Sequence, residues 1–222
     1  MTVTRRIFVS GAMAAPFLAQ LGGAAPASAA SALDTTFSLL DGSCEMRLTE
    51  LARTRLASEE IELQAVAPAT AVLGADGTTV EGVSMPPEYA TGTISPLGRP
   101  GAGSGRMLGG VVLRNSKARL EIAGIRGSVP DGRIFAFLKV DDEWLGEQPL
   151  YASDPSAMRL SVEPGAPGKP TALKGSGIPL TPTQEGVDVF TEAFGVALFT
   201  VADRVFTASG TGRAWPVPTL PV

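Results

Sequence analysis

Residues 111–142 read VVLRNSKARLEIAGIRGSVPDGRIFAFLKVDD, and this stretch decides the fold class. Polar and apolar residues alternate from Arg119 to Arg126, which is typical of a half-buried β-strand. A second strand is expected over residues 134–140. The segment Val129-Pro130-Asp131-Gly132 between them has the composition of a tight turn, because proline presets φ and glycine accepts positive φ. The stretch therefore predicts an antiparallel meander.

Two short helices are expected outside this meander. Thr49 is the expected N-cap of the first, in which Ala52 and Leu56 share a face. Near the C-terminus, Thr181-Pro182-Thr183-Gln184 predicts a capping box with Thr181 as the N-cap. Phe190 and Phe194 would face the core in this second helix, and Gly195 would end it. The final strand is expected over residues 204–208.

Glycine and proline divide the rest of the chain into short pieces. The 222 residues include 26 glycines and 18 prolines, a share that suits many strands joined by turns. We expect one all-β domain over residues 31–214, an antiparallel sandwich or flattened barrel with two short helices. The residues that lead into the two capped helices are weakly similar, which would fit two half-repeats over about 34–94 and 107–212. The proline-rich tail, 215–222, is expected to fray.

Three segments are expected to leave the sheet. Asp41-Gly42 predicts a turn directly after residues 35–40. Pro86-Pro87 together with residues 95–106, and residues 163–177, are rich in glycine and proline and predict two long loops. The first loop contains Gly101-Ala102-Gly103-Ser104-Gly105-Arg106, which looks like a phosphate-binding loop. It lacks the Lys-Ser/Thr ending and the preceding buried strand, so a flexible loop is the better interpretation.

The first thirty residues predict export. Arg5-Arg6 is followed by Phe8, a mild apolar run and Ala27-Ser28-Ala29, which together are typical of a twin-arginine signal peptide over residues 1–30. The apolar run is too short to remain as a membrane-spanning helix, so no span is expected in the mature chain. The protein is therefore expected to be secreted or associated with the cell envelope.

Composition excludes several classes of function. The chain has no histidine, so Ser-His-Asp and Cys-His catalytic sites cannot be built, and imidazole ligands for zinc are absent. Cys44 is the one cysteine, which would be buried or would form an intermolecular disulfide. The net charge is -4 and basic residues do not cluster, so no nucleic-acid partner is expected. No cofactor can be named from these residues.

The residues that could carry a site are few. Tyr89, Tyr151 and Trp144 lie near expected loops and are candidate ligand-binding residues, because aromatic side chains can form a ligand platform. No catalytic or metal-binding residue is assigned. Carboxylates could act as acid and base on a small molecule or glycan if they met in a pocket. The candidates for such a cluster are Asp131, Asp141, Asp142, Glu143 and Glu147. A solvated scatter of these residues would favour a binding protein instead.

The chain also resembles a known family of cell-surface domains. The phrases Val66-Ala67-Pro68-Ala69-Thr70, Gly109-Gly110-Val111-Val112-Leu113 and Leu180-Thr181, with Ala193-Phe194-Gly195, together resemble secreted β-rich actinobacterial proteins of the HtaA type. The resemblance implies a β-rich architecture, a cell-surface location and a link to haem capture. Such domains use tyrosine on the iron with a nearby histidine, which this chain lacks, so the resemblance carries over no ligand residue.

These patterns lead to one main hypothesis and two alternatives. The main hypothesis is a secreted, non-catalytic binding or envelope-associated module whose partner is an unknown small molecule or envelope component. The first alternative is an extracellular enzyme that uses carboxylates. The second is a haem-binding surface protein of the HtaA type.

Overall fold

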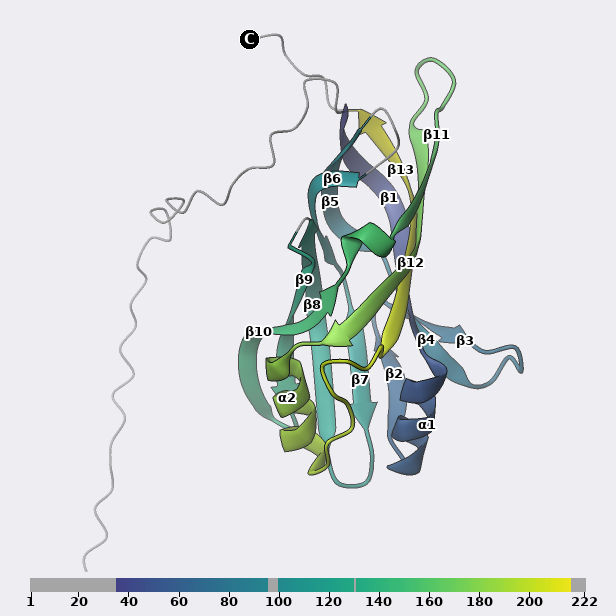
Figure 1. Ribbon diagram of the computed structural model, residues 1–222. Coiled ribbons are helices and arrows are strands. Elements are labelled where there is room, and N and C mark those ends of the chain that lie inside the picture. The colour runs from purple at the N-terminus through teal and green to yellow at the C-terminus, as the bar shows by residue number, and fades with distance from the viewer. Residues whose placement is uncertain (1–34, 96–99, 130, 217–222) are drawn as a thin grey trace, which may run out of the picture.

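The computed structural model describes residues 35–95, 100–129 and 131–216 (Figure 1). The expected signal peptide, 1–30, and residues 217–222 of the expected tail lie outside the described residues. The helices are α1 (Glu50–Ser58), α2 (Gln184–Phe194) and the 3-10 helix η1 (Pro155–Ala157). The strands are β1 (Thr35–Leu48), β2 (Glu62–Val66), β3 (Thr70–Leu73), β4 (Val80–Met85), β5 (Pro87–Ile94), β6 (Pro100–Met107), β7 (Gly110–Arg114), β8 (Arg119–Val129), β9 (Arg133–Val140), β10 (Glu143–Ser153), β11 (Arg159–Glu163), β12 (Thr171–Pro182) and β13 (Phe206–Pro216).

The strands form an antiparallel sheet that closes on itself. Its pairing runs from β12 through β13, β1, β5, β6, β8, β9 and β10, and β10 pairs again with β12. Both β1 and β8 change partners along their length. The first part of β1 pairs with β5 and its last part pairs with β4. The first part of β8 pairs with β7 and its last part pairs with β6. The result is a flattened antiparallel barrel, which confirms the predicted fold class.

The predicted meander is confirmed, whereas the predicted turn at Asp41-Gly42 is wrong. β7, β8, β9 and β10 follow one another as antiparallel neighbours. β1, however, continues for 14 residues through Asp41, and a bulge between Leu39 and Asp41 takes up the irregularity. The Asp41 carboxylate accepts hydrogen bonds from Arg213 on β13, so the Asp-Gly pair lies inside a ladder. Cross-strand pairing therefore overrides the local turn preference.

Both predicted glycine-rich loops are wrong in part. Pro87 begins β5, and residues 100–107 form β6, which pairs with β5 on one side and β8 on the other. Residues 171–177 belong to β12, and only the segment between Glu163 and Thr171 connects strands. Glycine weakens an isolated strand, but ladder partners on both sides supply the order that its composition does not. The last strand is also longer than expected, because β13 runs to Pro216.

The two helices begin in equivalent ways. Thr49 caps α1 as expected, and its side-chain oxygen accepts from the Ala52 N–H. The predicted cap at Thr181 is wrong, because α2 is capped by Thr183, whose hydroxyl oxygen accepts from the Gly186 N–H. Thr181 and Pro182 are the end of β12. Gly195 ends α2 in the left-handed conformation as expected, with φ 71°.

Each cap also ties its helix to the barrel. The Thr49 hydroxyl donates to the Arg204 carbonyl and its N–H to the Val205 carbonyl. The Thr183 hydroxyl donates to the Pro149 carbonyl, and its N–H donates to the neighbouring Leu150 carbonyl. The shared arrangement shows how alike the two strand-to-helix corners are. An origin of the halves by duplication stays a prediction.

The hydrophobic core lies mainly in the lower part of the barrel, where α1 and α2 flank the sheet (Figure 1). Phe190 and Phe199 are fully buried and meet edge to face, with ring centroids 5.5 Å apart. Arg55 of α1 donates to the Leu198 carbonyl and to Asp203, so this end is also closed by polar contacts. Across residues 35–95, 100–129 and 131–216, neither α-helix has the length and apolarity that crossing a bilayer requires.

Candidate functional site

The upper part of the barrel contains a cavity of about 410 Å³. One wall is formed by β1, β5, β6 and β8, and the opposite wall by β12 and β13. Met158, which lies between η1 and β11, and single residues of β4, β9, β10 and β11 complete the lining. The cavity extends to the end of the barrel where β1 begins and β13 ends, as its lining includes Phe37 and Ala214. An eight-stranded barrel is just wide enough to hold one small ligand when side chains do not fill it. The volume lies within the range of small-molecule sites.

The lining is almost entirely apolar. It includes the side chains of Phe37, Leu39, Ile94, Ile125, Val129, Ile134, Leu160, Leu173, Ile178 and Leu180. Its polar members are hydroxyl residues and Cys44; the Ser153 hydroxyl donates to the Gly132 carbonyl and the Thr93 hydroxyl to the Ala102 carbonyl. Within the described part of the chain, no Asp, Glu, Lys or Arg lines this cavity. A ligand here would gain from contact and desolvation rather than from charge.

Glycine opens the cavity on the side of β5, β6 and β8. Gly101, Gly103 and Gly105 share the inward face of β6 with Met107, because alternate strand residues point the same way. Gly127 occupies the equivalent position on β8, between Ile125 and Val129. Sequence reasoning assigned this part of β6 to a loop. The period of two in Gly101-Ala102-Gly103-Ser104-Gly105 is the signal that could have identified it as a strand.

Cys44 lies in the wall of the cavity. It is half-buried on β1, directly opposite Met85 of β4, and no second cysteine exists in the chain. Burial, with a smaller contribution from Glu45, raises the pKa of the Cys44 thiol to about 11. The thiol is therefore protonated at neutral pH and adds a small apolar group to the lining.

The candidate carboxylates do not gather in a pocket. Asp131 accepts from the Ser128 hydroxyl, Asp141 from the Arg119 N–H, and Asp142 is paired with Lys139 at the surface. Glu147 receives two hydrogen bonds of 2.7 Å from Arg126, which hold its pKa below the usual value. Each of these carboxylates, like the exposed Glu143, lies outside the cavity lining. This is the solvated scatter that favours a binding protein.

The three aromatic candidates lie apart from one another. Tyr151 is 1 % exposed in the core against Phe190 and Phe206, and its buried hydroxyl has no hydrogen-bond partner. Tyr89 is 47 % exposed on β5, and Trp144 is 60 % exposed on β10 beside Lys139. None of the three belongs to the cavity lining. A ligand-binding role for each stays a prediction.

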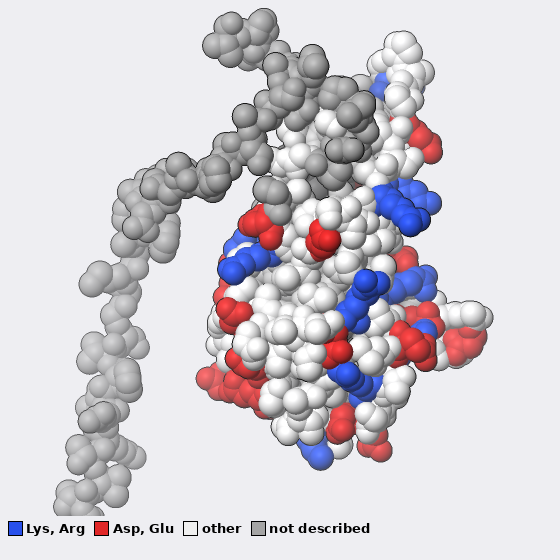
Figure 2. Space-filling model, viewed as in Figure 1, with Lys and Arg blue, Asp and Glu red and all other residues white. Residues whose placement is uncertain are grey.

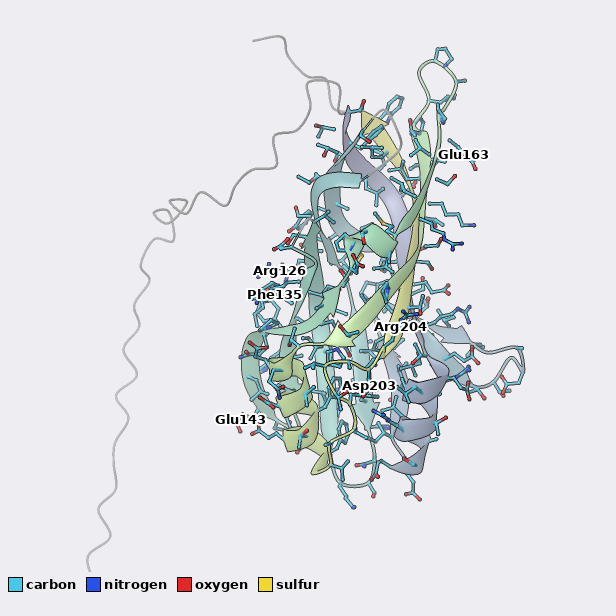
Figure 3. The ribbon with its side chains drawn as sticks, in the orientation of Figure 1. Arg126, Phe135, Glu143, Glu163, Asp203 and Arg204 are labelled. Atoms are coloured by element: carbon cyan, nitrogen blue, oxygen red, sulfur yellow. The ribbon has the colours of Figure 1, made fainter. Side chains whose placement is uncertain are left out.

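The outer side of the barrel carries pairs of cationic and aromatic side chains. Arg126 of β8 and Phe135 of β9 lie next to each other in Figure 3, with the guanidinium 4.3 Å from the ring centre. Arg126 also binds Glu147, so its charge is already neutralised by a neighbour. On the face seen in Figure 2, basic and acidic side chains are interspersed. This mixed charge pattern is that of an ordinary solvated surface.

Comparison with known proteins bears on the fold. Neither the models of protein families nor the curated proteins include one that matches this chain. Among solved structures, the chain is similar to the C-terminal domain of HtaA from Corynebacterium glutamicum, with a TM-score of 0.51. The similarity covers 81 % of this chain and 99 % of that domain at 11 % sequence identity. The likeness therefore shows a shared fold and agrees with the resemblance noted from sequence.

Proposed function

We propose that this protein is a non-catalytic binding module of the cell envelope, which holds one small apolar ligand in the upper cavity of its barrel. The observation that carries the proposal is the cavity itself, about 410 Å³ in volume and lined by apolar side chains and glycine. An apolar lining favours the uptake of apolar molecules, because water inside it gains fewer hydrogen bonds than in bulk.

The proposed location of the protein in the cell envelope rests on two other observations. Arg5-Arg6 and the following residues have the pattern of a twin-arginine signal peptide, and the fold is similar to that of a domain of HtaA. Replacing both arginines with lysine should abolish export while the protein still folds in the cytoplasm, because the pair is the recognition element. Undiminished export of the double variant would exclude the twin-arginine route.

Haem capture is a weaker alternative for this cavity. Tyrosinate can hold ferric haem, but Tyr89 and Tyr151 both lie outside the lining, and the chain has no histidine to assist. The residues present therefore do not fit haem in the way that the HtaA resemblance implies. Added hemin should give no stoichiometric Soret shift. A one-to-one titration that is lost in Tyr89→Ala or Tyr151→Ala would instead support haem binding.

A neutral fluorescent probe tests the main proposal. N-phenyl-1-naphthylamine should bind the purified protein saturably with one site, because the cavity excludes water and accepts an uncharged ring. Alkylating Cys44 with N-ethylmaleimide places the added group in the cavity wall and should block the probe. The Cys44→Ser variant, treated with the same reagent, is the matched control and should keep its binding. Absence of saturable binding to the untreated protein would overturn the proposal.

A further inference from the structure

The wall formed by β5, β6 and β8 carries a patch with almost no side chains. Two rows of residues that pair with one another across neighbouring strands define this patch. One row runs from Ala90 through Gly105 and Gly127 to Ile134. The row above it runs from Phe37 through Gly92 and Gly103 to Val129. All eight residues line the cavity.

The dimensions of this patch follow from the sheet. Neighbouring strands lie about 4.8 Å apart, and successive inward positions on one strand lie roughly 6.6 Å apart. Four glycines and Ala90 therefore expose bare backbone over about 10 Å across the strands and roughly 7 Å along them. Phe37, Val129 and Ile134 border the patch. We call this shallow patch the glycine plate, and larger side chains enclose it at its edges.

A patch of bare backbone does not favour all apolar ligands equally. A rigid ring system can lie on hydrogen-bonded peptide groups with every atom of one face in contact. A flexible chain touches the same plate with fewer atoms, and it loses rotational freedom when it is held there. The plate therefore favours planar over flexible ligands of similar size.

The sulfur atoms around the plate point to the same ligand class. Every methionine in the described residues lines the cavity, namely Met46, Met85, Met107 and Met158, and Cys44 lines it too. Thioether sulfur is polarisable and makes favourable contacts with the edges of aromatic rings. Methionine side chains also adapt their shape to an irregular ligand. The absence of charged side chains from the described lining leaves nothing to neutralise an ionic group.

We infer that the ligand is a flat, uncharged ring system, of the fused aromatic or quinone type, that lies on the glycine plate of β5, β6 and β8. The inference rests on the proposed function, because it assigns a ligand class to the same cavity. The cavity is the site, and the plate decides which shapes it accepts.

Two probes of matched size test the inference on the purified protein. They are 1-aminoanthracene, which is flat and neutral, and a saturated linear alcohol with the same number of carbon atoms. Direct titration should show that the ring binds at least about tenfold more tightly than the chain, owing to its larger contact with the plate and its lack of flexibility. Equal or tighter binding of the alcohol would overturn the inference and leave the proposed function standing. Failure of both probes to bind would overturn the proposed function itself.

A variant of the plate gives an independent test. A Cβ atom on Gly127 would lie 3.5 Å from Ile134 Cγ1 and 3.8 Å from the Arg133 carbonyl oxygen, which are ordinary contacts. Gly127→Leu should therefore be accepted while its side chain covers the plate. It should weaken ring binding by about tenfold or more and alter alcohol binding much less, because a chain can bend around the new group.

Two further proteins complete this test. Thr207→Leu places the same side chain on the exposed outer side of β13 and should bind both probes like the parent. Gly127→Ala adds one methyl group at the same point, so a few-fold loss of ring binding is expected even if the leucine variant folds poorly. Unchanged ring binding in folded Gly127→Leu, or in Gly127→Ala when the leucine variant is unfolded, would overturn the inference.

Discussion

The lower and upper parts of the barrel share one antiparallel ladder but differ in what their inward positions carry. Below, Leu113, Leu120 and Leu138 fill the interior and pack with the residues that close the end. Above, Gly103, Gly105 and similar positions leave the interior hollow. β8 belongs to both regions, with Leu120 and Ile122 in the core and Gly127 at the cavity. The difference shows that stability and binding can be divided along a single strand.

The largest expected effect comes from truncating a ring in the closed part. Phe190→Ala should lower the free energy of unfolding by about 3–5 kcal/mol, because a fully buried ring leaves a void among fixed neighbours. The matched variant Phe37→Ala should cost only about 1 kcal/mol, because its half-buried ring already borders a cavity. Urea unfolding of both variants measures the difference. Equal losses would mean that the upper part is as tightly packed as the lower part.

Enlarging an alanine should affect the two regions in opposite ways. Ala136 is fully buried in the core, so Ala136→Leu overpacks it and should cost about 1–3 kcal/mol. Ala90 lines the cavity, so Ala90→Leu has room and should leave the free energy of unfolding within about 0.5 kcal/mol of the parent or raise it. Thermal melts of the two variants test the contrast. A large loss in Ala90→Leu would show that the cavity cannot accept added volume.

The cap of α2 provides a smaller test of how the lower end is closed. Thr183→Ala removes the hydroxyl that accepts from the Gly186 N–H and should cost about 1 kcal/mol. Thr181→Ala, two residues earlier on β12, should change stability much less, because its side chain caps no helix. Chemical denaturation of both variants decides between the two positions. A greater loss of unfolding free energy in Thr181→Ala would indicate that Thr181, as expected from sequence, is the N-cap of α2.

In the upper part, the burial of Cys44 should have little effect on stability at neutral pH but a large effect on how fast its thiol reacts. Burial holds the pKa of Cys44 at about 11, so at pH 8 its thiolate fraction is on the order of a hundredfold below that of an exposed thiol. Alkylation by N-ethylmaleimide should be correspondingly slow in the native state and should accelerate as pH rises towards 11. Because the folded pKa lies above the unfolded one, the contribution of Cys44 to stability is present in full below about pH 9 and should be lost as pH rises from about 9 towards 11. A fast reaction at pH 8 would show that the thiol is freely hydrated.

Much of the fold could be predicted because it depends on local pattern. The strand β8, its pairing with β9 and the cap at Thr49 are each decided by a few adjacent residues and appear where expected. The strict alternation expected in β8 is interrupted at Gly124, where the register shifts, so Ile125 rather than Gly124 follows Ile122 as a buried residue. The errors fall where local and long-range preferences conflict. Asp41-Gly42 and the segment around Gly103 have the composition of turns and loops, yet each gains ladder partners from strands distant in sequence. The candidate site was missed for the same reason.

The sequence alone determined the antiparallel β class, the two helices and the exclusion of histidine-dependent chemistry, because these follow from composition and short-range periodicity. Only the tertiary structure decided where the site lies. Glycines on β5, β6 and β8 become one plate only through the register of three strands, and Cys44 joins four methionines only when the barrel closes. Register and closure depend on every strand pair at once. No local pattern could therefore show that the glycine-rich residues 101–105 form part of the wall of a cavity.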